Sequence, residues 1–257
     1  MNIVVCVKQV PDLNQIRIKG DTGEPVINGV PYRLSEFDKN ALEAAITLKE
    51  KHGGKVTAVS IGTPKIKETI KESLAMGADE ALLVVDESWT GGDPGRTAGL
   101  LVRAVEKLGT FDLILVGEGS ADNYSGQVGP RLAERLGIPQ ITYVRALELV
   151  DGKIRATRDL EDCYEVVEAP FGVLISVTSE LNSPRLPSLT KILAAAKKPV
   201  TVTTPAELQE VRNGTYVEQI RNVAPPLSRK GIFLEGDADK VAEELVRALE
   251  NEGVLRR

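Results

Sequence analysis

The chain has 257 residues and a formal net charge of −5, with 42% hydrophobic and 27% charged residues. This composition is that of an ordinary globular protein, long enough to bury a full core. Aromatic residues make up only 4% of the chain, which together with the negative charge argues against a nucleic-acid-binding protein. Because no apolar run is long enough to cross a bilayer, we expect a protein that does not span a membrane.

The first residues and the cysteines indicate the compartment. The stretch from Met1 to Val5 enters a strand pattern at once and has no basic region, so we expect no signal peptide. Cys6 and Cys163 form no Cys-x-x-Cys pair, and His52 is the single histidine. We therefore expect neither a disulfide framework nor a metal site, and we expect a cytoplasmic location.

Strand and helix patterns alternate in the first half of the chain. Ser35 is a candidate N-cap for the first helix, with Asp38 three residues on, and Asp93-Pro94 begins the third helix. The alternation predicts a doubly wound, mostly parallel, Rossmann-like α/β sheet. Apolar runs predict strands at 2–7, 55–61, 80–85 and 111–116, helical periodicity predicts helices at 34–51, 66–76, 94–108 and 128–136, and a short hairpin is expected within 16–27.

After Pro139, strand patterns follow one another without helices between them. Asp151-Gly152 is a hairpin signal between the first two, so we expect an antiparallel extension of the sheet. The run 173–177 is apolar enough to be a central strand. The four expected strands are 140–150, 153–159, 165–168 and 173–177.

The last part of the chain is poor in long apolar runs. Residues 179–187 show no helix pattern, and two prolines flank Leu186; a short helix is expected at 189–198. An amphipathic helix is expected at 238–249, and a tail of this type cannot bury much surface by itself. We therefore expect an α/β domain at 1–198 and a C-terminal extension at 199–257 that either returns to the sheet or wraps a partner.

The connection between the strand ending at Val116 and the helix beginning at Val128 is rich in small residues, amides and hydroxyls, and it contains the carboxylate of Asp122. Small residues let a ligand approach the backbone, and the helix start offers free N–H groups to an anion. In open parallel sheets, ligands bind at the carboxyl ends of strands, where this loop lies. It is either a phosphate and ribose cradle or a polar surface loop, and its chemistry alone leaves both open.

Several common motifs are absent from the sequence. No Gly-x-Gly-x-x-Gly follows the first strand, and there is no P-loop. Gly117 to Ala121 lacks the flanking pattern of a nucleophile elbow, which argues against a serine hydrolase. Lys8 ends the first strand, where it could meet a ligand phosphate or simply face solvent. His52 ends a helix among lysines, which indicates a structural role, so no catalytic residue is predicted.

Five segments resemble the β subunits of electron transfer flavoproteins, the family that includes the FixA proteins. They occur in the family's order, and the resemblance covers residues 1 to about 198. The segments are Val5–Pro11, Phe37–Ala45, Asp122–Pro130, Glu161–Glu168 and Asn182–Ser188.

The resemblance implies a heterodimer with an α subunit that holds a redox-active FAD, on which the extension 199–257 would pack. It implies that this chain binds an adenine nucleotide and helps to pass electrons between dehydrogenases and a quinone or ferredoxin-type acceptor. The nucleotide is AMP in many members and a second FAD in electron-bifurcating members. A recognition loop matching 182–188, with Leu186 as its anchor and Pro187 beside it, would bind a partner dehydrogenase or quinone oxidoreductase.

The candidate cofactor-binding residues combine that resemblance with the loop chemistry. They are Cys6, Lys8, Ser35, Phe37, Asp38, Ile61, Gly117, Asp122, Asn123, Tyr124, Ser125, Gly126, Gln127, Val128 and Gly129. Many members read Asp-Gly-Asp-Thr where this chain has Asp122 to Ser125. Tyr124 thus replaces an acidic residue and removes a negative charge beside a phosphate, which favours a diphosphate. We therefore expect FAD in this chain, with AMP as the alternative.

Two other classes of function fit this sequence less well. A nucleotide-binding signalling or stress protein of similar fold needs neither the strand-rich segment after Pro139 nor the Pro-Leu-Pro loop. A small hydrolase needs a nucleophile, a histidine and an acid, and this sequence offers no such set.

Overall fold

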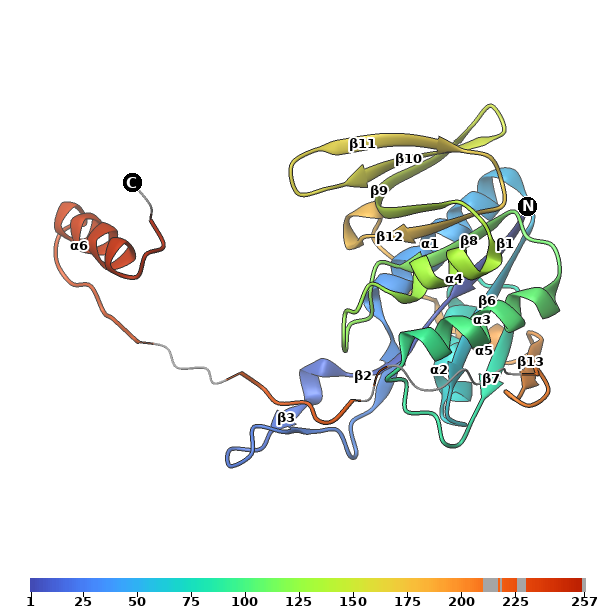
Figure 1. The fold of residues 1–257 in the computed structure, drawn as a ribbon, viewed down its shortest axis with the longest axis horizontal. Coiled ribbons are helices and arrows are strands. Elements are labelled where there is room, and N and C mark those ends of the chain that lie inside the picture. The colour runs from blue at the N-terminus through green and yellow to red at the C-terminus, as the bar shows by residue number, and fades with distance from the viewer. Residues whose placement is uncertain (210–216, 218, 226–229, 256–257) are drawn as a thin grey trace.

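A computed structural model describes residues 1–209, 217, 219–225 and 230–255 (Figure 1). Its centre is a nine-stranded sheet with the strand order β11-β10-β9-β12-β8-β1-β6-β7-β13. The strands are β1 (Asn2–Cys6), β6 (Lys55–Gly62), β7 (Glu80–Val85), β8 (Leu113–Gly117), β9 (Gln140–Val150), β10 (Lys153–Asp159), β11 (Tyr164–Ala169), β12 (Val173–Val177) and β13 (Val200–Thr203).

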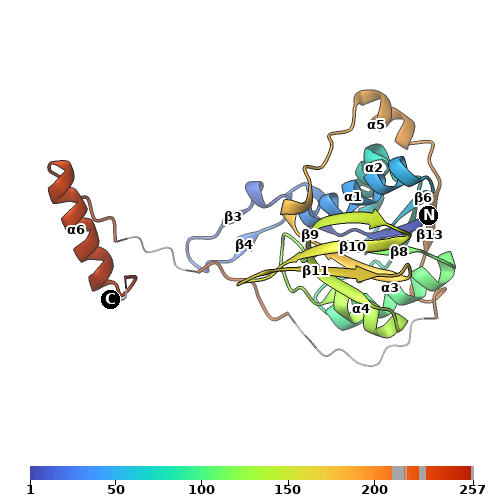
Figure 2. The same cartoon turned by 90° about the horizontal axis from the view of Figure 1, so that it is seen from above.

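The described helices lie on both faces of this sheet or beyond its edge. They are α1 (Glu36–His52), α2 (Ile66–Met76), α3 (Pro94–Leu108), α4 (Val128–Leu136), α5 (Leu189–Ala195) and α6 (Ala238–Asn251), with 3-10 turns η1 (Leu13–Gln15) and η2 (Ser179–Leu181). Figure 2 shows α1 and α2 on one face and α3 and α4 on the other. Two buried apolar clusters match these layers: Ile3 and Val5 of β1 join the first, and Val4 and Cys6 join the second.

The sheet is parallel except at one end. β1 pairs in parallel with β6 and β8, and β12 pairs in parallel with both β8 and β9. β10 pairs antiparallel with β9 and with β11. The predicted doubly wound α/β fold with an antiparallel extension is therefore confirmed, and so is the central position of the strand at 173–177.

Several local predictions need correction. Ser35 stands at the N-cap position of α1, but its hydroxyl does not cap the helix; it accepts a hydrogen bond from the Ala121 N–H at 3.3 Å. Asp38 makes no capping box, because its carboxylate is buried against two other strand ends. The segment 179–187 contains the turn η2, and α5 ends at Ala195 instead of continuing to 198.

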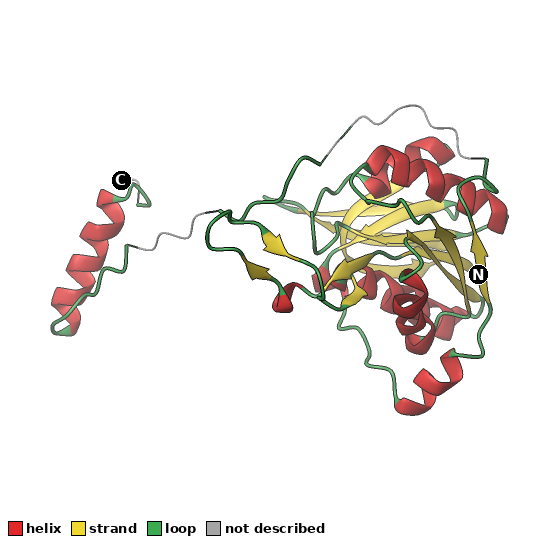
Figure 3. Cartoon of the chain, turned by 90° about the horizontal axis from the view of Figure 1, so that it is seen from below, coloured by secondary structure: helices red, strands yellow, loops and turns green. Residues whose placement is uncertain are grey.

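Two short ribbons precede α1. β2 (Gln9–Pro11) pairs with β5 (Tyr32–Leu34), a pairing that the sequence patterns did not predict. β3 (Arg17–Ile18) pairs with β4 (Pro25–Val26), as the predicted hairpin requires. The β3–β4 ribbon extends away from the main sheet (Figure 3).

The chain after residue 198 first returns to the sheet. β13 pairs in parallel with β7 and forms the edge of the sheet. α6 lies apart from the sheet in all three views (Figures 1, 2 and 3), and none of its residues is buried. Within the described part of the chain, no helix combines the length and apolar character required to cross a membrane.

Candidate functional site

A cavity lies where the carboxyl ends of β1, β6 and β8 meet. Its lining includes Cys6, Ile61 and Val116 from these strands, Thr97 from α3, and the stretch 125–130 that leads into α4. Its volume is about 110 Å³, below the roughly 300–1,000 Å³ of a pocket that encloses a whole ligand. The cavity therefore has room for the buried part of a ligand, with the remainder lying across the loop outside.

The structure brings most of the predicted site residues to this cavity. Four others, Ser35, Phe37, Asp122 and Tyr124, are not in its lining but surround its mouth through contacts with loop residues. The predicted residues that line it are Cys6, Lys8, Asp38, Ile61, Gly117, Asn123, Ser125, Gly126, Gln127, Val128 and Gly129.

Asp38 joins three elements beneath the cavity. Its carboxylate accepts hydrogen bonds from the backbone N–H of Lys8 at 2.7 Å and of Gly117 at 3.2 Å. Burial raises the pKa of Asp38 to about 7, although both N–H donors act in the opposite direction. Asp38 therefore links the first turn of α1 to the ends of β1 and β8, and so fixes the floor of the site.

Lys8 lies across the loop that follows β8. Its Nζ is 2.7 and 2.8 Å from the two Asp122 carboxylate oxygens and 3.2 Å from Ser120 Oγ. Both charged side chains are about one-third exposed. An ion pair exposed to this degree contributes little to stability, on the order of 0–1 kcal/mol, so Lys8 is available to a phosphate that competes with Asp122.

Tyr124 is held in a defined position at the mouth. Its φ is 43°, in the left-handed region that non-glycine residues seldom adopt. Its ring lies 5.4 Å from the Phe37 ring, centroid to centroid. A Cβ on Gly119 would come within 2.7 Å of the Tyr124 ring, so the glycine gives the ring its place. Burial, with a hydrogen bond to Glu118, raises the pKa of Tyr124 to about 12.

The start of α4 faces this loop. Gln127 occupies the N-cap position without capping the helix; its side-chain oxygen instead accepts hydrogen bonds from Arg131 at 2.9 and 3.1 Å. Gly129 packs closely, because a Cβ there would lie 3.0 Å from Val116 Cγ2. Val128 and Gly129 at the start of α4 thus line the cavity and receive no side-chain cap from Gln127, an arrangement that suits an anion.

Comparisons with known proteins identify the family. The electron transfer flavoprotein domain matches residues 26–208. An electron transfer flavoprotein subunit beta from Thermoanaerobacterium thermosaccharolyticum is 40% identical over 99% of this chain and 100% of its own length. The chain belongs to the electron transfer flavoprotein β-subunit family. It is also similar to the subunit of that name from Clostridium acetobutylicum, which is 43% identical over 79% of this chain and 78% of its own length.

A third relative comes from a named complex. Subunit CarD of the caffeyl-CoA reductase-Etf complex of Acetobacterium woodii is 35% identical over 99% of this chain and 100% of its own length. The family assignment gives this chain a role in electron transfer. It also excludes the signalling protein and the hydrolase as readings of the sequence.

Sequence reasoning missed part of the lining in this family member. Trp89 and Gly91, in the connection between β7 and α3, and Ser176 of β12 also line the cavity. The Asp93-Pro94 helix start was a usable signal, because it places the β7–α3 connection at the same edge of the sheet as the loop after β8. Ser176 gave no such signal, since it is one polar residue within an apolar strand.

Cys6 also lines the site but is not a nucleophile. Burial, with a smaller contribution from Asp38, raises the pKa of the Cys6 thiol to about 12, so it stays protonated near neutral pH. Among the residues that the structure describes, no three His, Cys, Asp or Glu side chains gather closely enough to hold a metal ion.

Proposed function

We propose that this chain is the β subunit of a heterodimer, and that it binds an adenine nucleotide in the cavity at the ends of β1, β6 and β8. The α subunit would hold the redox-active FAD. The observation that carries the proposal is the convergence of the α4 N-terminus, the Lys8 ammonium group and closely packed glycines on one cavity. Together they offer a phosphate N–H donors, a positive charge and close approach to the backbone.

The residues fit a nucleotide in distinct roles. The α4 amides and Lys8 would hold phosphate, and the loop side chains of Asn123 and Ser125 would hydrogen-bond phosphate or ribose. Backbone groups at Cys6 and Ile61 would face the adenine. These roles follow from the resemblance and from the positions of the residues around the cavity.

FAD is the nucleotide that we propose, with AMP as the alternative. Tyr124 leaves the mouth without the acidic residue that many family members carry there. A second cavity of about 370 Å³ lies beside Trp89 and Gly91, which line both cavities, and it gives a ligand longer than AMP room to extend. When bound, FAD supplies reversible one- and two-electron chemistry, which AMP lacks. Electron bifurcation, with a dehydrogenase on one side and a quinone or ferredoxin-type acceptor on the other, depends on that second flavin.

Counting flavins in the purified heterodimer tests this proposal. Denaturation releases both ligands, and the visible spectrum with chromatography counts FAD and AMP per heterodimer. We expect two FAD. One FAD and one AMP per heterodimer would mean that this chain binds AMP and not FAD. One FAD with no second adenine nucleotide, after supplying both during refolding, would contradict nucleotide binding by this chain.

Replacement of Lys8 tests the phosphate site. We expect Lys8→Met to weaken nucleotide binding about ten-fold, which corresponds to about 1.4 kcal/mol, because the phosphate loses its charge-assisted partner. Isothermal titration of nucleotide-free heterodimer with AMP and FAD measures the change. Lys19→Met is the matched control, since Lys19 pairs with Glu24 on the β3–β4 ribbon, away from the cavity. Equal affinities in wild type and Lys8→Met would remove Lys8 from the site.

We also propose that residues 182–188 bind the partner dehydrogenase or quinone oxidoreductase. Leu186 is 93% exposed, and a single large apolar side chain that a partner can bury is typical of an interface anchor. Leu186→Ala should raise the KM of the dehydrogenase for the heterodimer about ten-fold, with little change in the free energy of unfolding, because the side chain touches solvent. Steady-state kinetics at varied heterodimer concentration measures this. The control is Val166→Ala, exposed on β11; a KM equal to that of wild type for Leu186→Ala would argue against docking by this loop.

We propose that the extension 199–257 packs on the α subunit beyond β13, where the chain leaves the sheet. α6 carries apolar residues at a spacing of four along one stripe, Val241, Leu245 and Leu249, and none of its residues is buried in this chain. A helix with an uncovered apolar stripe needs a partner surface.

The location that we propose for the heterodimer is the cytoplasm.

A further inference from the structure

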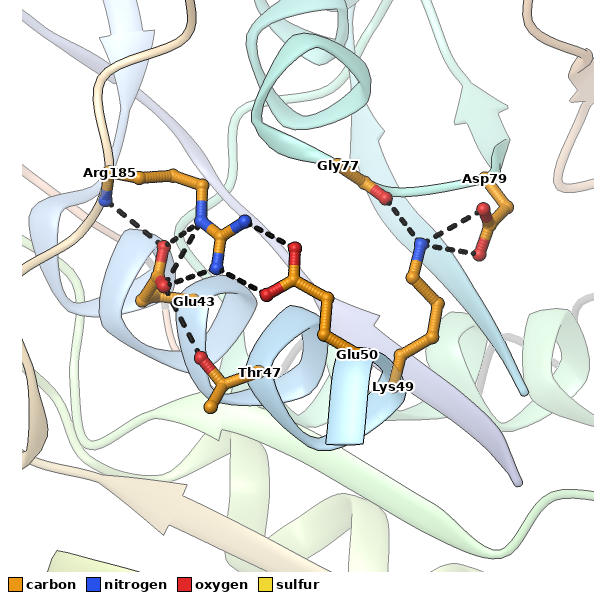
Figure 4. Close-up of polar contacts among 7 residues, drawn as sticks. All are labelled: Glu43, Thr47, Lys49, Glu50, Gly77, Asp79 and Arg185. Carbon is orange, nitrogen blue, oxygen red and sulfur yellow. Dashed lines mark hydrogen bonds and ion pairs between the residues drawn. The ribbon is translucent and has the colours of Figure 1, made fainter. Parts of the chain in front are cut away.

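Arg185 is clamped by two carboxylates of α1 (Figure 4). Its Nε donates to Glu43 at 2.8 and 3.1 Å, and its two terminal nitrogens donate to Glu50 at 2.6 and 2.9 Å. The Arg185 backbone N–H adds a further bond to Glu43 at 3.0 Å. Glu43 and Glu50 lie seven residues apart, two turns along one face of the helix, so the planar guanidinium spans both.

The clamp is only partly open to water. Glu43 is buried, at 8% exposure, and also accepts a hydrogen bond from Thr47. Burial acts to raise the pKa of Glu43, but the bonds from Arg185 outweigh it and the pKa is lowered. The separate hydrogen bonds from Arg185 to Glu50 lower the pKa of Glu50. Both carboxylates therefore stay ionised beside Arg185 at neutral pH, and charge-assisted bidentate pairs of this kind are the strong ones.

A second pair fixes the start of the same segment. Asn40 of α1 donates to the Asn182 carbonyl at 2.7 Å, and Asn182 donates back to the Asn40 carbonyl at 3.0 Å. α1 is itself anchored on another side, where Lys49 Nζ contacts the Gly77 carbonyl at 2.8 Å and both Asp79 oxygens at 3.0 Å (Figure 4). The segment 182–185 is thus fastened at both ends to a helix that cannot easily shift.

The residues just after the clamp are highly exposed and apolar. Leu186 is 93% exposed, Leu189 is 71% exposed and Leu193 is 66% exposed. An apolar side chain on a freely moving loop loses conformational entropy on docking, and this loss is smaller for Leu186, which directly follows the fastened segment 182–185. The clamp therefore gives this surface a fixed shape before any partner arrives.

We propose that Arg185 is a positioning residue that, held by Glu43 and Glu50, fixes residues 182–188 on α1 so that Leu186 meets the partner dehydrogenase in a preformed position. This inference rests on the docking role proposed above for the same segment. Because the first turn of α1 also borders the nucleotide cavity, one rigid helix sets the position of the docking segment and of the nucleotide together.

Trypsin measures the clamp without any partner, because the Arg185–Leu186 bond is a trypsin site. In the full heterodimer we expect Glu43→Gln/Glu50→Gln to raise the rate of that cut at least five-fold, since the freed arginine can enter the protease. Arg185→Lys keeps the charge and the cleavage site, but an ammonium group cannot bind both glutamates as the planar guanidinium does. The cut should again be at least five-fold faster, after correction for the cleavage rates of the two denatured proteins. The control is Glu148→Gln/Glu168→Gln, which releases Arg155 of β10 from Glu148 of β9 and Glu168 of β11.

If the rate of trypsin cleavage rises less than five-fold in both clamp variants, and both melt at the wild-type temperature, the inference is overturned. If one variant fails to fold, the other decides. The second readout is kinetic: Arg185→Lys should raise the KM of the dehydrogenase for the heterodimer at least five-fold, with kcat within two-fold and the nucleotide content unchanged. A raised KM for Leu186→Ala with an unchanged KM for Arg185→Lys overturns the positioning role and leaves docking in place. An unchanged KM for Leu186→Ala removes docking itself, while trypsin still judges the clamp.

Discussion

Gly117→Ala is expected to destabilise the protein by roughly 2–4 kcal/mol and to weaken nucleotide binding by at least about ten-fold. A Cβ at this position would lie 2.6 Å from Asp38 Oδ1 and 2.7 Å from Phe37 Cβ, with the Phe37 backbone carbon at 3.0 Å. Contacts this short with the start of α1 cannot be relieved by turning one side chain. The helix start has to move, and the bond from the Gly117 N–H to Asp38 moves with it.

Urea denaturation measures the loss of stability, and titration with AMP or FAD measures the loss of nucleotide affinity. Gly20→Ala is the matched control, because a Cβ there has no heavy atom within 4 Å; its effect on unfolding should stay within about 0.5 kcal/mol. Gly117→Ala with the affinity and stability of wild type would mean that the α1–β8 junction does not shape the site.

The sequence predicts those elements of the fold whose signal lies within a few consecutive residues. Buried parallel strands such as β1 and β12 show up as continuous apolar runs, and Asp93 accepts a hydrogen bond from the Gly95 N–H, as a helix cap should. β13 is different: the strand from Val200 to Thr203 is short, and its first three residues are exposed at the edge of the sheet. Its place beside β7 depends on a pairing more than one hundred residues away, which no local pattern contains.

The lining of the cavity was predictable to the same extent. The loop after β8 carries its own chemistry in its composition, so its position at the strand ends followed from the alternation of elements. Asp38 and Ser35 carried a misleading signal, because a serine followed by an acid three residues later is also how a capping box reads. Here both side chains serve distant backbone N–H groups, at Ala121, Lys8 and Gly117. Arg185 gave no signal at all, since its two glutamates are more than 130 residues away.

Asp38 has the largest expected effect of pH on stability. Its carboxyl is buried in the folded state, which raises the pKa from 3.8 to about 7. Between these two values the unfolded chain has lost a proton that the folded chain keeps, so the unfolded state binds fewer protons and stability falls as pH rises. The stabilising contribution is therefore complete below about pH 4 and is lost as pH rises through 7. At about 1.4 kcal/mol per pH unit, the change between pH 5 and pH 8 comes to roughly 2–3 kcal/mol.

Asp38→Asn isolates this effect, because asparagine does not titrate while its size is nearly the same. The amide presents one oxygen and an NH2 group where the carboxyl group presents two oxygens, so the variant leaves one backbone N–H without an acceptor, at a cost of about 1–3 kcal/mol. The pH-dependent part lies on top of that cost: wild type should exceed the variant in unfolding free energy by more at pH 5 than at pH 8, by that same 2–3 kcal/mol. Urea denaturation of nucleotide-free protein at several pH values measures the difference. A difference that stays constant from pH 5 to pH 8 would mean that Asp38 is ionised throughout, its two N–H donors then outweighing its burial.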